Sequence, residues 1–119
     1  MTTDDQPYPD HWSAAARDAV EEVLEVRGDL AGADLAALTQ VADLITAADA
    51  LASAARADGY TTAGSTGQTV VHPAIIEARL ARTAAASILA RLASPSAGTG
   101  AMTSTARART AARARWATR

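Results

Sequence analysis

The sequence contains no cysteine, no lysine and no phenylalanine in its 119 residues. Without cysteine the chain has no disulfide, no thiolate zinc site and no cysteine nucleophile. Without lysine it cannot form the G-x-x-x-x-G-K-[ST] loop that binds nucleotide phosphates, although residues 59–72 are rich in glycine. No uninterrupted apolar run approaches the ~20 residues of a membrane span. The polar, acidic first ten residues differ from a secretory signal. We therefore expect a soluble cytosolic protein without membrane contact.

Alanine is abundant, with 33 copies, and all eleven basic side chains are arginine. Alanine is the best helix former, but each buried alanine removes little apolar surface from water. We therefore expect one modest domain of closely packed helices whose burial is completed by neighbouring copies. A high-GC coding sequence enriches alanine and arginine as well, so composition alone does not decide between assembly and coding bias.

Charge is segregated along the chain. Residues 1–60 contain twelve acids and three arginines, whereas residues 61–119 contain a single acid and eight arginines. This pattern predicts a C-terminal end that faces a polyanion and a separate acidic end. The candidate nucleic-acid-binding residues are the five arginines of the last thirteen residues, Arg107, Arg109, Arg113, Arg115 and Arg119.

Apolar spacings of three and four residues predict three helices. The first covers about 10–27, with Asp10 as its N-cap and a stop at Gly28. The second covers 34–58 and the third 73–93, opened by Pro73.

The segments between and around these helices complete the predicted organisation. Residues 59–72 form a loop or a short extended hairpin, so the second and third helices make a long antiparallel helical hairpin. Residues 1–9 are predicted to be a flexible acidic N-terminus and 94–104 a linker. Residues 105–119 are predicted to be a short basic helix or a flexible tail, because they are too polar to fold alone. The predicted class is all-α.

The second predicted helix carries two neighbouring apolar stripes, a band wider than one partner helix covers. Either this helix lies between two elements of its own chain, or one stripe faces another copy. In so short a chain we favour the second alternative. The residues predicted to pack in the core or between copies are Trp12, Leu38, Val41, Leu44, Ile45, Leu51, Ile76, Leu80, Ile88 and Leu92.

Four segments, in order, resemble the phage terminase small subunit family. Pro9, His11 and Trp12 resemble the family's entry to its first helix, and residues 34–51 its second helix. The most specific segment is 57–75, which combines an acidic-then-glycine helix end, a turn with Gly64 and Gly67, and His72–Pro73 opening the next helix. The run TSTARART at 103–110 resembles the family's closing arginine element.

The sequence has no nucleophile–base pair, metal cluster or phosphate loop, which predicts a non-enzymatic protein without cofactor or metal. The resemblance implies that the protein forms a ring. It implies binding to double-stranded viral DNA at the region where packaging starts, and regulation of the large terminase subunit, which holds the ATPase and nuclease. Its partners would be that DNA, the large subunit and further copies of itself, in the cytoplasm of the infected bacterial host. An alternative is a helical phage assembly protein whose basic tail binds protein.

Several side chains have two interpretations. Arg79, Arg82 and Arg91 could face a ring channel or pair with Asp43, Asp49 or Asp58 between subunits. A capping or packing role for His72 is favoured over chemistry. Trp116 could stack on bases or pack in the protein. Helical spacing places Glu21, Glu22 and Glu25 on a solvent face, as solvation or as a docking surface for a basic partner.

Overall fold

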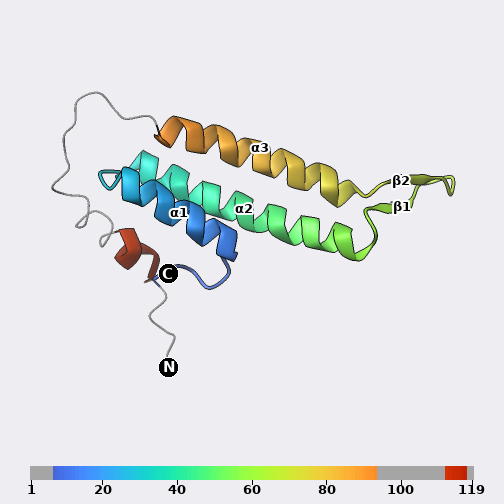
Figure 1. Ribbon diagram of the computed structural model, residues 1–119, viewed down its shortest axis with the longest axis horizontal. Helices are drawn as coiled ribbons and strands as arrows, with labels where there is room; N and C mark the ends of the chain where they lie inside the picture. The colour runs from blue at the N-terminus through green and yellow to red at the C-terminus, as the bar shows by residue number, and fades with distance from the viewer. Residues whose placement is uncertain (1–6, 94–111, 118–119) are drawn as a thin grey trace.

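The structure, a computed structural model, describes residues 7–93 and 112–117 of the chain (Figure 1). It is mostly helical, as predicted, with one short two-stranded sheet in addition. Its elements are α1 (Ala14–Val26), α2 (Ala33–Ala57), β1 (Thr61–Ala63), β2 (Thr69–Val71) and α3 (Pro73–Ala93), and residues 112–117 are also helical. Figure 1 shows α2 and α3 running antiparallel, with α1 alongside the first part of α2 and the sheet beyond the far end of the hairpin.

Helix α1 begins later than the sequence suggested, because Ser13 rather than Asp10 is its N-cap. The Ser13 hydroxyl accepts from the Ala16 amide at 3.2 Å and donates to Asp49 Oδ2 of α2 at 2.7 Å. The Ser13 amide donates to Thr46 Oγ1 at 3.0 Å. Since Thr46 and Asp49 lie on α2, tertiary contacts select the start of α1, and Trp12 falls just before the helix instead of within it.

Helix α2 packs between α1 and α3 of the same chain. Leu38 and Val41 are fully buried, and Leu44 and Ile45 are half-buried against the same core. The part of the wide apolar band that carries these residues is therefore packed against elements of its own chain, the first of the two alternatives.

Helix α2 has the length predicted from the sequence, but it is more apolar than the lack of an uninterrupted apolar run suggested. It has 25 residues and contains an 18-residue window of mean hydropathy 1.4, which meets the length and composition of a membrane span. The two aspartates in the middle of α2 accept hydrogen bonds from elsewhere in the fold: Asp43 from Trp12, and Asp49 from Ser13 and Arg82. Asp43 and Asp49 thus join α2 to the start of α1 and to α3.

The connection between α2 and α3 begins with a Schellman motif. The Tyr60 amide donates to the Ala55 carbonyl at 2.7 Å and the Gly59 amide to the Arg56 carbonyl at 3.0 Å. Gly59 has φ of 79°, the left-handed conformation that this motif requires. The chain then forms an antiparallel hairpin in which Thr61 pairs with Val71 and Ala63 with Thr69. The interval 59–72 is thus the extended hairpin, one of the two forms the sequence allowed.

His72 joins this hairpin to both long helices. Its amide donates to the Tyr60 carbonyl at 2.9 Å, and its Nε2 lies 2.9 Å from Asp58 Oδ2. Its Nδ1 accepts from the Ala74 amide at 3.1 Å, which caps the first turn of α3 after Pro73. The role of His72 in this fold is local capping.

The core divides into two parts. We call residues 48–82 the distal half and residues 7–47, 83–93 and 112–117 the proximal half. In the distal half the buried side chains are alanines, Ala48, Ala55 and Ala78. The buried side chains of the proximal half include both tryptophans and five leucines. They are Tyr8, Trp12, Ala16, Val20, Leu24, Leu30, Leu35, Leu38, Val41, Ala42, Ala85, Leu92, Ala112 and Trp116.

Other residues predicted to pack are less covered. Leu51 is half-buried, as is Ile88, which packs against the proximal core. Ile76 and Leu80 are 42% and 51% exposed. Within the single chain, these two residues of α3 are therefore not part of the core.

Candidate functional site

Residues 112–117, here called the docked segment, pack against the N-terminal end of the chain. Trp116 is only 1% exposed and lies with its ring centroid 5.1 Å from Trp12 and 5.6 Å from Tyr8. Tyr8 and Trp12 stack at 5.8 Å. These three rings, the aromatic cluster, have the edge-to-face and stacked geometries that favour aromatic packing.

The polar atoms of the aromatic cluster are all bonded. Trp116 Nε1 donates to Thr39 Oγ1 of α2 at 2.9 Å, and Trp12 Nε1 donates to Asp43 Oδ1 at 3.0 Å. A buried indole N–H without an acceptor would lose its hydrogen bond to water without replacement. The acceptors on α2 therefore allow both indole rings to be buried when the docked segment packs here.

Glu21 of α1 receives the second contact of the docked segment. Arg113 Nη2 donates to both Glu21 oxygens, with 2.6 Å to Oε1, and Arg113 Nε donates to the Tyr8 hydroxyl at 3.3 Å. The Tyr8 hydroxyl itself donates to Glu21 Oε2. One carboxylate therefore accepts from a guanidinium and a phenol at once.

The pKa values of this group follow from the contacts. Burial, followed by the hydrogen bond to Glu21, raises the pKa of Tyr8 from 10.0 to about 12. The hydrogen bond to Glu21, helped by the one to Tyr8, raises the pKa of Arg113 further above its usual value. Both shifts favour the protonated phenol and the charged guanidinium, the forms that hold the docked segment in place.

Several sequence expectations change here. Arg113 lies half-buried against α1, and residues 112–117 form a short helix, one of the two forms predicted for 105–119. Glu21, predicted on a solvent face, is half-buried and paired, while Glu22 and Glu25 are exposed as expected. Trp116 packs in the protein, one of its two alternatives. Arg115 is exposed, and Arg107, Arg109, Arg119 and the linker 94–104 lie outside the described residues.

Sequence reasoning missed Tyr8 and Thr39. Tyr8 was assigned to a flexible N-terminus, yet it is 5% exposed in the core. Composition held a signal: with two tryptophans, two tyrosines and no phenylalanine, each aromatic ring carries a large share of the available apolar volume. Thr39 gave no such signal, because its importance comes from a ring 77 positions away.

The arginines of α3 differ in their contacts. Arg82 Nη2 lies 3.1 Å from Asp49 Oδ1 within the same chain, so this pair is not the predicted contact between subunits. Arg79 and Arg82 line a shallow groove of about 380 Å³ on α3, together with Ile75, Ala78, Thr83 and Ala86. Arg79 and Arg91 are exposed and form no ion pair within the part of the chain that the structure describes.

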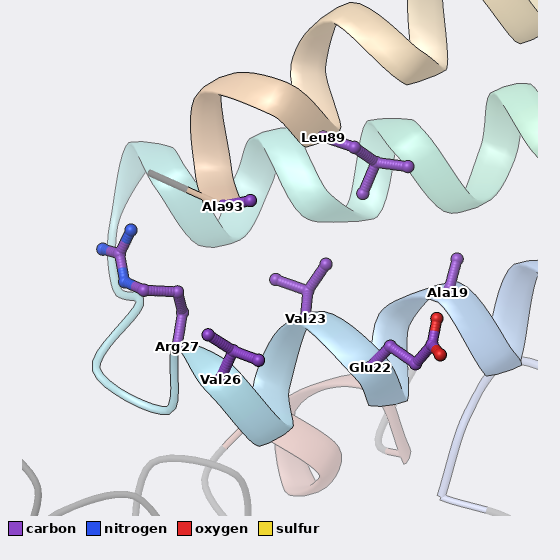
Figure 2. Close-up of a pocket in the computed structure, with 7 residues that line it drawn as sticks. All are labelled: Ala19, Glu22, Val23, Val26, Arg27, Leu89 and Ala93. Atoms are coloured by element: carbon purple, nitrogen blue, oxygen red, sulfur yellow. The ribbon is translucent and has the colours of Figure 1, made fainter. Parts of the chain in front are cut away.

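A second pocket lies between α1 and α3. Figure 2 shows Val23 and Val26 of α1 facing Leu89 and Ala93 of α3, with Glu22 and Arg27 at the rim. Its volume of about 220 Å³ is below the several hundred Å³ typical of small-molecule sites. Arg27 closes one end, because its Nη1 donates to the Leu92 carbonyl at 2.8 Å and its Nε to Asp29 at 2.9 Å.

Comparison with protein-family models, curated proteins and solved structures gives no match. The function therefore has to be argued from the residues of this chain.

The polar side chains of the connection between α2 and α3 make local structural contacts. Within residues 7–93 and 112–117 no group of three or more His, Cys, Asp or Glu side chains could hold a metal ion. Gly64 and Gly67 lie in the turn of the β hairpin, and both ring nitrogens of His72 are engaged in local contacts. The arrangement with the clearest capacity for interaction is the arginine-bearing docked segment on its acidic and aromatic surface.

Proposed function

We propose that this protein is a DNA-packaging adaptor, the small terminase subunit of a tailed phage, acting in the cytoplasm of the infected bacterial host. It assembles into a ring, binds double-stranded viral DNA where packaging starts, and regulates the large terminase subunit without catalysis of its own. The observation that carries the proposal is the clustering of arginine at the C-terminal end, five within thirteen residues, after an acidic first half.

Arginine clustering supports DNA contact for a physical reason. The planar guanidinium donates two parallel hydrogen bonds to phosphate and keeps its charge at neutral pH. Each phosphate contact releases condensed counterions, so binding would weaken steeply as salt rises. No helix among the described residues carries the combination of Asn, Gln and Arg side chains with which proteins contact base edges in the major groove. This favours contact with the DNA backbone.

The fold supports the family part of the proposal through one segment. Residues 57–75, the most specific part of the terminase resemblance, form the end of α2, the whole β hairpin and the start of α3. The acidic residue and histidine of that segment, Asp58 and His72, contact each other at 2.9 Å. The features that define the resemblance thus serve one structural purpose, the tip of a long helical hairpin.

Self-assembly has support in the distal half. Four of its large apolar side chains, Tyr60, Val71, Ile76 and Leu80, are between 42% and 56% exposed. Two helices alone leave one face of each without cover, and neighbouring copies would bury these residues. A heterologous contact of this kind closes into a ring when its rotation permits.

The alternative function, a helical assembly protein whose basic tail binds protein, is favoured by one observation. Arg113 and Trp116 contact protein in this structure, namely Glu21 and the aromatic cluster. If the whole tail serves this purpose, its arginines would recognise acidic protein surfaces and not DNA.

The decisive experiment combines native mass spectrometry of the full chain with DNA binding measured over a range of salt. We expect a closed homo-oligomer, and binding to duplex DNA whose affinity falls linearly with salt on logarithmic axes, with a slope of about −0.9 per phosphate contact. Deleting residues 103–119 should remove most of that slope. A monomeric protein without salt-sensitive DNA binding would overturn the proposal; a tail deletion that abolishes partner binding but keeps DNA binding would favour the alternative.

A further inference from the structure

The docked segment uses its arginine in a way that conflicts with DNA contact. Arg113 Nη2 donates to both oxygens of Glu21, and Arg113 Nε donates to the Tyr8 hydroxyl. Binding of a phosphate through the Nε–Nη2 edge of the guanidinium would require these same donors, because a carboxylate and a phosphate present similar pairs of oxygens. Arg113 cannot bind Glu21 and a phosphate with those donors at the same time.

The other contacts of the docked segment are coupled to the contact between Arg113 and Glu21, so they form or break together with it. Trp116 follows Arg113 by three positions, so both side chains lie on one side of a single helical turn. Trp116 is buried between Tyr8 and Trp12 and bonded to Thr39. Tyr8 contacts Trp116 through its ring and Arg113 through its hydroxyl, so it couples the two interactions.

We propose that the surface formed by Tyr8, Trp12, Glu21 and Thr39 is a binding site for the Arg113–Trp116 turn, and that this site competes with polyanions for Arg113. Binding of a phosphate by this edge of Arg113 then requires the docked segment to leave α1, so Glu21 lowers the affinity of the tail for DNA. This inference rests on the proposed DNA contact of the basic tail.

The test compares two substitutions that change the net charge equally. Glu21→Gln removes the carboxylate that binds Arg113. Glu22→Gln removes the carboxylate of the next residue, which is exposed and does not contact Arg113. Fluorescence anisotropy of a labelled duplex DNA of mixed sequence, at several salt concentrations, gives the affinity of the full-length wild type and both variants.

We expect Glu21→Gln to strengthen DNA binding about two- to fivefold over both the wild type and Glu22→Gln, the range that corresponds to one partly exposed ion pair. Equal affinities for the two variants, with DNA binding intact, would overturn the competition and leave the proposed function standing. Absence of DNA binding in all three proteins at low salt would overturn both.

A second measurement follows the docked segment itself. Acrylamide quenching of tryptophan emission in the wild-type protein reports the shielding of Trp12 and Trp116, which are 2% and 1% exposed. Saturating duplex DNA should increase quenching, because undocking opens the aromatic cluster to solvent. Full shielding in the DNA-bound protein would contradict the proposal even if Glu21→Gln binds DNA more tightly.

Discussion

The proximal and distal halves of this molecule pack their helices with side chains of different size. In the proximal half, three long helices and the docked segment enclose tryptophan, tyrosine, leucine and valine. In the distal half, α2 and α3 pack on each other through Ala48, Ala55 and Ala78, and their larger side chains remain exposed. Large side chains are buried only where a third element covers them, because two helices alone enclose little volume.

This difference predicts where the stability of the fold resides. A buried tryptophan contributes several times the apolar area of a buried alanine, whereas an alanine contact permits close approach of two helix backbones. Substitutions that shrink a buried side chain should therefore lower the free energy of unfolding most in the proximal half. Substitutions that enlarge a buried alanine should lower it in the distal half.

The largest effect is expected for Trp12→Ala. The substitution removes a ring that stacks on Tyr8 and meets Trp116 edge-on, together with the hydrogen bond to Asp43. We expect the free energy of unfolding to fall by about 3–5 kcal/mol, measured by urea denaturation. Trp12→Phe should recover more than half of the loss. If Trp12→Ala costs less than an ordinary exposed substitution, the aromatic cluster does not hold the proximal half together.

The next effect is expected for Ala78→Leu in the distal half. Ala78 is 1% exposed at the α2–α3 contact, so a larger side chain would push the two helices apart. The expected loss is about 1–3 kcal/mol of unfolding free energy. Ala84→Leu, at an exposed position of α3, is the matched control and should leave stability nearly unchanged. Equal effects for both substitutions would show that the distal helices are not in close contact.

High pH should weaken the proximal half selectively. Burial and the hydrogen bond to Glu21 raise the pKa of Tyr8 to about 12 from 10.0, so the stability from its protonated hydroxyl is complete below pH 10 and is lost as pH rises through about 12. Tryptophan quenching measured across this window should increase in the wild type. In the Tyr8→Phe variant this position cannot ionise, so tryptophan quenching should not increase over this pH window. If the wild type and the variant show the same quenching at every pH, ionisation of Tyr8 is not the cause.

The smallest effect on stability is expected for Leu80→Gln. Leu80 is 51% exposed in the distal half, and exposed substitutions usually change the unfolding free energy by less than about 0.5 kcal/mol. If neighbouring copies cover this face, the variant should nevertheless form smaller assemblies in sedimentation velocity. Thr83→Gln, exposed on the same helix, is the control. An unchanged assembly would place the contact between copies elsewhere.

Regular periodicity made the helices predictable. Pro73 opens α3 as expected, because proline fixes φ and lacks an amide donor at a position where the helix needs none. The start of α1 was not predictable, since Asp10 and Ser13 are both good N-caps and the choice depends on Thr46 and Asp49, more than thirty residues away. Local sequence identifies candidate caps, and tertiary contacts choose among them.

The candidate site was predictable only in part. The sequence pointed to the arginines at the C-terminal end, and the structure adds the partner of one of them, Glu21. Helical periodicity assigned Glu21 to solvent because periodicity considers only the helix that carries the residue. Docking of Trp116 on Tyr8 and Trp12 joins positions about a hundred residues apart, a pairing that no local pattern encodes.

Asp49 has a consequence for how the alanine-rich helices find a single arrangement. Smooth alanine surfaces fit together almost equally well after one helix slides or rotates by a turn, so they discriminate poorly among near-degenerate packings. One oxygen of Asp49 accepts from Ser13 at the start of α1, and the other accepts from Arg82 in α3. A rotated or displaced α2 would lose both hydrogen bonds together, so this carboxylate favours one registry of three helices that alanine alone would leave ambiguous.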